Sequence, residues 1–345
     1  MIERVDITDF TIFESFTWDG MGTLNLIIGE NDTGKSNLLK LLYVLARSLQ
    51  ESRPETADPW PDVLARKLRW TFQPRDLELG RLVRKGARRT SVEAKLYSGK
   101  TASFSFGPST TKQIKEADLD PFVEKFGPNA LFFPPKEVLT ALQAIAATRE
   151  RLGFTGFGDT YLDLIQALRQ PKSHLDTDEA LEAILRELDA IFAGTIEQEQ
   201  DGSFEYRRGS SRFDMTETAE GIKKVGGLVH LLRNGTVRVG STLFFDEPGA
   251  HLHPNAILDF VRLLFRLAQA DVRIFIATHS YVVLKQFELL AREHKERVPL
   301  CVLSPSEDNG VTAQFADLQD RIPSNSIVDA SVELFEREVD MTLAQ

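Results

Sequence analysis

Eight consecutive residues have the types and the spacing of a loop that holds phosphate groups. They match the pattern G-x-x-x-x-G-K-[ST] and read Gly29-Glu30-Asn31-Asp32-Thr33-Gly34-Lys35-Ser36. Glycines let the backbone curl so that successive amide N–H groups point toward phosphate oxygens. The lysine adds a positive charge at the β- and γ-phosphates, and the serine hydroxyl is a ligand for Mg²⁺. We therefore predict that residues 29–37, through Asn37, bind ATP, with Lys35 in a catalytic role and Ser36 on the metal ion.

Two acidic residues, Glu30 and Asp32, lie inside this predicted anion-binding loop. Carboxylates that faced the phosphates would repel them, so we expect both side chains to point outward while the backbone amides face the ligand. We also expect a left-handed backbone at Asp32, a conformation that aspartate tolerates better than most residues. The alternative, a glycine-rich turn with an incidental lysine, is disfavoured because an apolar strand pattern precedes the loop and an apolar-faced helix pattern follows it.

A second acidic pair follows another short apolar run. Residues 241–248 read S-T-L-F-F-D-E-P, which places Asp246 and Glu247 at the carboxyl end of a buried strand. Sheets of α/β proteins bind their ligands at that edge. We predict that Asp246 reaches Mg²⁺ through its water shell, and that Glu247, on the opposite face of an extended chain, orients and deprotonates the attacking water. Without the phosphate loop, the same acids would indicate only an ordinary strand terminus.

Five apolar runs are expected to form the sheet that positions these residues. Continuous apolar runs of this length suit strands buried on both faces, with helices covering a parallel sheet. Helical patterns lie between several of them, including an apolar face over residues 38–49 and another over 257–267. The sequence therefore predicts an α/β fold with a mostly parallel sheet flanked by helices. The five runs cover residues 24–28, 130–133, 243–245, 274–277 and 300–303.

Two regions interrupt the alternation of strands and helices. Residues 91–106 have the alternating pattern of an antiparallel hairpin, and residues 137–193 are mostly helical in pattern. A second, short hairpin is expected to turn at Asp201-Gly202. We interpret both regions as insertions into a single domain of residues 1–345, in which residues 137–215 form a helical and hairpin lid. They are too short to form a long coiled-coil arm.

Composition narrows the class of protein. With 42% hydrophobic and 27% charged residues, the 345-residue chain is typical of globular proteins. The sequence has no apolar run of membrane-spanning length and no secretory leader pattern. Cys301 is its single cysteine, so no disulfide can form within the chain. We therefore expect a cytoplasmic protein without a membrane partner. A net charge of −10 repels polyanions, so DNA would need a local basic patch. The candidate patch, which could equally be a solvated face, is Arg81, Arg84, Lys85, Arg88 and Arg89.

The residues around Asp246 resemble motifs of a known class of ATPases. Residues 246–254, D-E-P-G-A-H-L-H-P, look like the Walker B motif and following D-loop of ABC-type ATPases, and more narrowly like the RecF/SMC/OLD-like branch. The strand that ends in Thr278-His279-Ser280 is similar to the switch-histidine segment of that class. The resemblance implies an ABC-type head that contains an antiparallel β portion and binds ATP and Mg²⁺, with His279 contacting the γ-phosphate as a catalytic residue.

Two further segments resemble parts of such a head. Ala219, Glu220 and Gly221 begin a stretch similar to the S-x-G-x-[KR] signature, which caps the ATP held by the other subunit. Alanine replaces the expected serine, which removes one hydroxyl contact, but Gly221 and a helix N-terminus can still face phosphate. Residues 132–137 resemble the loop that senses Mg²⁺ and the γ-phosphate, but without its glutamine, and Lys136 and Glu137 are the candidates to replace it.

The resemblance implies a switch that dimerises head to head around ATP. Stand-alone heads of this kind control a separately encoded effector, often in antiphage defence, and the chain leaves no room after His279 for the nuclease domain of OLD-type proteins. The alternatives are a RecF-like DNA-binding clamp in repair, acting through residues 81–89, and a nucleotide-binding subunit without turnover. Two minor readings also remain open. His251 and His253 could bind a metal ion, and Phe10, Phe13 or Trp18 could stack on adenine.

Overall fold

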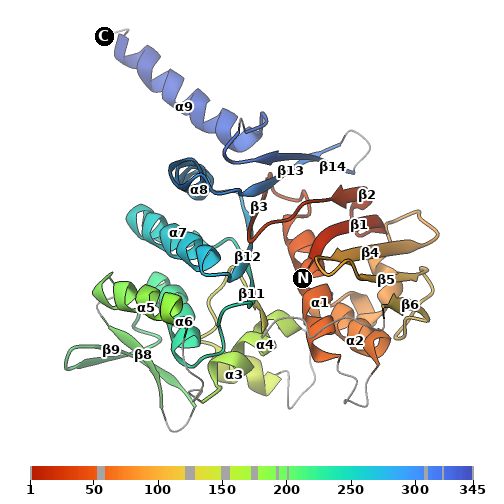
Figure 1. Ribbon diagram of the computed structural model, residues 1–345, viewed down its shortest axis with the longest axis horizontal. Coiled ribbons are helices and arrows are strands. Elements are labelled where there is room, and N and C mark those ends of the chain that lie inside the picture. The colour runs from red at the N-terminus through yellow and green to blue at the C-terminus, as the bar shows by residue number, and fades with distance from the viewer. Residues whose placement is uncertain are drawn as a thin grey trace.

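The computed structural model describes residues 2–52, 59–120, 129–148, 156–171, 178–191, 194–199, 202–306, 310–320 and 322–343. Within them, a central sheet has the strand order β14-β13-β3-β12-β11-β7 (Figure 1). The five strands from β13 to β7 run parallel, and β14 pairs antiparallel with β13 at the edge. All five predicted apolar runs lie in this sheet, so the predicted α/β class is confirmed. The strands are β3 (Leu24–Gly29), β7 (Ala130–Phe133), β11 (Thr242–Asp246), β12 (Arg273–Thr278), β13 (Pro299–Pro305) and β14 (Val311–Asp317).

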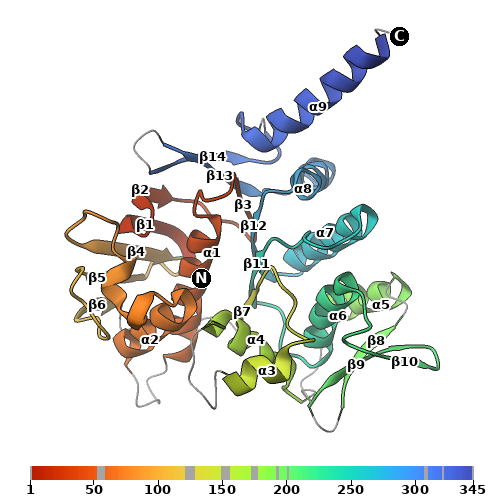
Figure 2. The ribbon, with the colours of Figure 1, turned by 180° about the vertical axis from the view of Figure 1, so that it is seen from behind.

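Helices cover both faces of the central sheet because its strands present apolar side chains on each side. Phe244 of β11 packs with α1 (Lys35–Glu51) and α2 (Trp60–Phe72), whereas the next residue, Phe245, packs with the opposite cluster. That opposite cluster includes α6 (Glu220–Arg233), α7 (Pro254–Gln269) and α8 (Tyr281–His294). The helix that leaves the predicted phosphate loop and the helix that follows the predicted signature therefore lie on opposite faces of the sheet (Figures 1 and 2).

A second, antiparallel sheet packs beside α1 and α2. Its order is β2-β1-β4-β5-β6, and the predicted hairpin of residues 91–106 forms β4 and β5. Because β4 also pairs with β1 over residues 2–8, this hairpin continues the sheet begun by the first strands and is not an isolated insertion. The strands are β1 (Ile2–Phe10), β2 (Phe13–Trp18), β4 (Thr90–Leu96), β5 (Thr101–Phe106) and β6 (Glu116–Leu119), and the short 3-10 helices Arg75–Leu77 and Leu79–Leu82 precede β4.

The middle of the chain forms helices and a small sheet, as its pattern predicts. The predicted second hairpin is present as β8 and β9, with an unpredicted third strand, β10, beside β9. Its predicted turn residue Asp201 lies outside the described residues. A last helix, α9 (Ser326–Leu343), projects from the body (Figures 1 and 2). The remaining elements are α3 (Leu142–Ala146), α4 (Asp159–Leu168), α5 (Glu179–Ile191), β8 (Thr195–Gln198), β9 (Phe204–Arg208) and β10 (Ser211–Asp214).

None of the helices that the structure describes combines the length and the apolar character needed to cross a membrane.

Candidate nucleotide-binding site

The loop between β3 and α1 has a backbone that requires its glycines. Gly29 and Gly34 have φ values of 153° and 83°, in the region that favours glycine. A Cβ atom at Gly29 would lie 2.3 Å from the carbonyl oxygen of Leu303, and one at Gly34 would lie 2.7 Å from Ile12 Cδ1. Asp32 has a φ of 65°, so the left-handed conformation predicted for it is confirmed. The loop is therefore held in a tight curl by close backbone approach.

The start of α1 leaves its amide groups available to an anion. No described side chain caps this N-terminus, and the first turn, which includes Asn37, contains no acidic residue. The first N–H groups of a helix lack partners within the helix and carry the positive end of its dipole. The side chains of Glu30, Asn31 and Asp32 are exposed, in agreement with the outward orientation expected of the two acids. This arrangement fits a phosphate group.

Lys35 lies over the loop and is almost fully buried. Its Nζ donates to the carbonyl oxygens of Gly29 at 2.9 Å and Glu30 at 2.6 Å. Thr33 Oγ1 also donates to the Glu30 carbonyl, at 2.9 Å. Burial lowers the pKa of Lys35, although the nearby carboxylate of Glu247 opposes the shift. Because the acceptors described for this buried ammonium group are neutral carbonyls, a phosphate is well placed to neutralise its charge.

Ser36 and Asp246 meet, although they are 210 residues apart in the sequence. Ser36 Oγ donates to Asp246 Oδ1 at 2.9 Å, because α1 begins at the same sheet edge where β11 ends. Burial raises the pKa of Asp246, and the Ser36 hydrogen bond only partly opposes this shift. Hydroxyl and carboxylate oxygens are the ligands that Mg²⁺ prefers, and a divalent cation would compensate this buried charge. The two residues therefore fit the predicted Mg²⁺ site.

Glu247 does not continue the extended chain as we predicted. Its φ is 51°, and its backbone N–H donates to the carbonyl of Ala277 at 2.8 Å, so the strand ends at Asp246 and the chain turns toward the end of β12. The Glu247 carboxylate accepts a hydrogen bond from Thr278 Oγ1 at 2.9 Å. It also lies 2.6 Å from His279 Nδ1. The predicted catalytic acid and the switch histidine are therefore in direct contact. Thr278, which we did not predict as a site residue, also contacts Glu247.

The signature segment lies away from the phosphate loop of its own chain. Ala219 is the N-cap residue of α6, without a side-chain capping bond, and Gly221 packs against Leu252 of the predicted D-loop. Glu220 lies 3.6 Å from His251 in the same region. Since α6 and α1 cover opposite faces of the sheet, these residues do not join the Lys35 site within one molecule (Figure 2).

Two lysines of α6 connect the signature helix to the acidic strand end and to the loop after β7. Lys224 Nζ donates to the carbonyls of Glu247 at 3.1 Å and Ala250 at 3.3 Å. Lys223 Nζ donates to Thr140 Oγ1 at 2.8 Å and lies 3.6 Å from the Glu137 carboxylate. These four contacts were not predicted, because α6 and the two segments that hold the partners are far apart in the sequence. They hold α6 in a fixed position relative to the Glu247 backbone.

The loop that follows β7 lies next to the acidic strand end. Lys136 and Glu137, the candidates for the sensing position, line a cavity that also includes Asp246. Glu137 pairs with Lys223 inside this cavity, whereas no ion pair is described for Lys136. Tyr161 of α4 is a further neighbour, since the charge of Asp246 contributes, after burial, to raising the pKa of this tyrosine.

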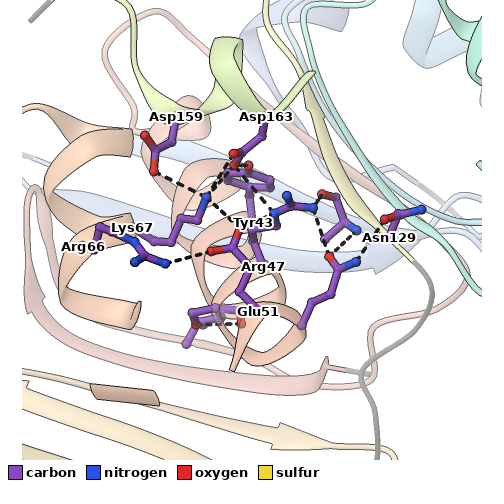
Figure 3. A network of polar contacts seen from close by, with 12 residues as sticks. Tyr43, Arg47, Glu51, Arg66, Lys67, Asn129, Asp159 and Asp163 are labelled. Carbon is purple, nitrogen blue, oxygen red and sulfur yellow. Dashed lines mark hydrogen bonds and ion pairs between the residues drawn. The ribbon is translucent and has the colours of Figure 1, made fainter. Parts of the chain in front are cut away.

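A buried polar network fastens α4 to α1, the helix that leaves the phosphate loop (Figure 3). The Tyr43 hydroxyl donates to Asp163 Oδ2, and Lys67 Nζ donates to the same oxygen at 2.8 Å. Arg47 Nε and Lys67 Nζ lie 2.8 and 2.9 Å from Glu51 Oε1. Burial works against the ionised form of Asp163, but the charges of Lys67 and Arg47 outweigh it and lower the pKa. The network therefore joins α1, α2 and α4 through compensated buried charges.

The two alternative predictions, a metal site at His251 and His253 and aromatic stacking on adenine, find no support in the described residues. Phe10, Phe13 and Trp18 are at most 1% exposed and belong to the core beside α1. Among the described residues, no group of three or more histidine, cysteine, aspartate or glutamate side chains is arranged to hold a metal ion. His253 instead caps α7, where its Nδ1 accepts from the backbone N–H of Asn255 at 3.3 Å. These aromatic residues are therefore core residues, and the histidines form no zinc-type cluster.

Acidic side chains partly neutralise the basic segment proposed for DNA. Arg81 lies 3.3 Å from Glu78, and Arg84 lies 2.8 Å from Glu14. Arg89 forms an ion pair with Glu116. These pairings leave less positive charge for phosphate backbones than the sequence suggests.

Three comparisons with known proteins bear on the fold of this chain. Residues 136–285 match the family model described as "AAA domain, putative AbiEii toxin, Type IV TA system". The chain resembles the SMC head domain from Thermotoga maritima, with 13% identity and a TM-score of 0.50 over 93% of this chain and 99% of that chain. It also resembles an SMC head bound to the C-terminal winged-helix domain of ScpA, with 12% identity and a TM-score of 0.54 over 92% and 98%.

A curated relative adds a short match. An "ATP/GTP phosphatase" from Helicobacter pylori is 49% identical over 45 residues, which are 13% of this chain and 12% of that protein. Together with the SMC heads, these matches confirm the predicted fold of an ABC-type ATPase head. The SMC heads share this fold, and the match of residues 136–285 supports the resemblance read from residues 246–254.

Proposed function

We propose that this protein is a Mg²⁺-dependent ATPase that works as a molecular switch. The observation that carries the proposal is the meeting of Ser36 and Asp246 at 2.9 Å, at the sheet edge that also carries Glu247. One point at that edge thus combines a phosphate-binding loop, oxygen ligands for a cation and a carboxylate that can accept a proton.

Each residue has a part in the proposed reaction. The amides of residues 29–37 and the ammonium group of Lys35 bind the phosphates of ATP. Ser36 and Asp246 hold Mg²⁺, which when bound neutralises charge on the β- and γ-phosphates. Glu247 orients the attacking water and accepts its proton, and His279 contacts the γ-phosphate. Thr278 and His279 together fix the direction in which the Glu247 carboxylate points.

We propose that two copies close around two ATP molecules. The support for this step is that α6 lies on the opposite face of the sheet from α1, the helix that leaves its own phosphate loop. A second copy can bring its α6 N-terminus to the exposed side of bound ATP, and the same contact is then made in reverse, as a two-fold interface requires. Hydrolysis would release both contacts and reopen the dimer.

We propose that the switch controls a separate effector protein in the cytoplasm, for example in antiphage defence. The matched family model names a putative toxin of a toxin–antitoxin system. One of the similar SMC heads was solved with a domain of a different protein, ScpA. Both comparisons support a head that acts together with another protein.

The proposal is tested with purified wild-type protein and a Glu247→Gln variant. We expect the wild type to release phosphate from ATP only when Mg²⁺ is present. We expect the variant to bind ATP, to lose turnover by at least about 100-fold, and to sediment as a dimer with ATP and as a monomer without it. Glu93→Gln, which alters an exposed carboxylate on β4, is the control and should retain activity. Undiminished turnover in Glu247→Gln would overturn the catalytic assignment.

A further inference from the structure

Beyond its first turn, the helix α9 presents an apolar stripe that the rest of the described chain leaves uncovered. It projects away from the sheet and its flanking helices (Figures 1 and 2). None of its eighteen residues is buried, and only its first turns touch the body, where Ile327 and Val328 pack against the core beside α8. Phe335 is 65% exposed and Leu343 is 80% exposed. A concentration of large exposed apolar side chains on one element marks an interaction site in a folded protein.

The stripe has a regular spacing. Val328, Val332, Phe335 and Val339 follow one another at intervals of four, three and four residues, which places them along one side of the helix. This is the spacing of the a and d positions through which one helix packs along another. Over eighteen residues the helix is about 27 Å long, enough for a partner helix to lie along the stripe.

An acidic row runs beside the stripe. Each of the four apolar residues is followed directly by an acid, namely Asp329, Glu333, Glu336 and Asp340. A displacement of one residue is about 100° around a helix, so the four acids form a row parallel to the stripe. With Glu338 and a single arginine, Arg337, the helix has five acidic residues, one basic residue and a net charge of −4.

This charge decides between the possible occupants of the stripe. Helices that lie on membranes carry lysine and arginine on their polar face, and anionic lipids would repel an acidic row. A second copy of α9 would bring two helices of charge −4 together. A basic helix would satisfy both rows, with apolar residues on the stripe and lysine or arginine opposite the acids. Opposite charges along two paired helices stabilise the complex, and they also discriminate between a basic and an acidic partner.

We propose that α9 is the docking helix for a partner protein, and that the partner presents a basic amphipathic helix to it. This extends the effector control proposed above, because it names the chemistry of the partner. The docking surface is remote from the phosphate loop and needs no nucleotide. The docking proposal is therefore tested without ATP. If the docking proposal fails, the ATPase assignment remains intact.

Two synthetic three-heptad peptides serve as probes for the full-length chain. Both carry leucine at the a and d positions, and the flanking positions are lysine in one peptide and glutamate in the other. We expect fluorescence anisotropy to show that the lysine peptide binds at least tenfold more tightly than the glutamate peptide, with an affinity that falls as salt is added. A variant with Glu333→Lys, Glu336→Lys and Asp340→Lys is expected to reverse the preference. Both the wild type and this variant should hydrolyse ATP equally.

A second pair of variants distinguishes binding to the stripe from non-specific binding to any exposed apolar side chain. Phe335→Ser should weaken binding of the lysine peptide at least tenfold, whereas Phe213→Ser, which alters an exposed phenylalanine on β10, should not. Equal affinities for the two peptides, or binding that survives Phe335→Ser, would refute the proposal. So would sedimentation that shows α9-dependent dimers of the wild type without nucleotide, because the occupant would then be a second copy.

Discussion

Thr278 Oγ1 donates a hydrogen bond to Glu247 Oε2 at 2.9 Å, because Thr278 ends β12 and Glu247 directly follows the neighbouring strand β11. Thr278 is fully buried, and its hydroxyl also accepts from the backbone N–H of Ser280 at 3.1 Å. The hydroxyl proton is therefore directed at the carboxylate by a second, fixed bond. His279 Nδ1 lies 2.6 Å from the other oxygen, Oε1, and the His279 backbone N–H donates to Oε1 at 3.1 Å and to Oε2 at 3.4 Å. This arrangement fixes the orientation of the carboxylate before any ligand arrives.

Replacing Thr278 with valine tests this positioning role. Valine has nearly the same shape but no hydroxyl, so the carboxylate loses one of its orienting bonds. We expect kcat for ATP hydrolysis to fall about tenfold while KM for ATP stays within about twofold, since the bonds described for the Thr278 hydroxyl go to Glu247 and Ser280 and not to the phosphate loop. Thr278→Ser, which restores the hydroxyl, should recover most of the activity. Equal losses in the serine and valine variants, measured by phosphate release, would argue against a role for the hydrogen bond.

The tight curl of the phosphate loop leads to a second prediction. A Cβ atom at Gly29 would overlap the carbonyl of Leu303 on β13, and neither backbone can move without breaking the pairing of β3 with β13. We expect Gly29→Ala to weaken ATP binding at least tenfold, because the curled amides would be displaced. Gly99→Ala is the matched control, since that glycine also has a positive φ but has open space around its Cβ position. Titration with a fluorescent ATP analogue measures both variants.

The raised pKa of Asp246 predicts how Mg²⁺ binding depends on pH. A proton and the cation compete for the same carboxylate, so the apparent affinity for Mg²⁺ should fall as the pH is lowered through the pKa of this group. Because burial raises that pKa, the loss should begin at a higher pH than it would for an exposed aspartate. We expect Asp246→Asn to weaken Mg²⁺ about 10–100-fold and to flatten the pH dependence.

Titrations of ATP hydrolysis with Mg²⁺ at several pH values provide the measurement. Asp32→Asn, an exposed acid of the phosphate loop, is the control and should keep the pH dependence of the wild type. A steep pH dependence that persists in Asp246→Asn would assign the titrating group elsewhere.

The sequence allowed the sheet and the phosphate loop to be predicted because their signals are local. Continuous apolar runs indicated the five parallel strands, and a fixed spacing of glycines and lysine indicated the loop. The conformation of Glu247 was predicted wrongly, since its φ depends on a hydrogen bond to Ala277 on another strand. The bond from Tyr43 to Asp163 joins residues 120 positions apart, and no periodicity predicts such a pair. Contacts of this kind depend on how whole elements pack.

The network around Asp163 supports the last prediction, which concerns stability. Asp163 is buried, and its carboxylate accepts hydrogen bonds from Tyr43 and Lys67. Asp163→Asn removes one of the charges that compensate Lys67 and Arg47, both of which keep Glu51 as a partner. The cost should therefore lie at the low end of the about 3–5 kcal/mol that breaking a buried ion pair takes. We expect that loss in the free energy of unfolding at pH 7, measured by urea denaturation. Asp118→Asn, an exposed acid on β6, should change it by less than about 0.5 kcal/mol.

The pH dependence of this loss has a definite sign. The pKa of Asp163 is lowered in the folded protein, so its contribution is fully present above the pKa of the unfolded chain, about 3.9. The contribution decreases as the pH falls from there toward the lower pKa of the folded state. The difference in unfolding free energy between the wild type and Asp163→Asn should therefore be constant from about pH 6 to 8 and shrink below about pH 4. A difference that grew on acidification would mean that Asp163 is protonated in the native network.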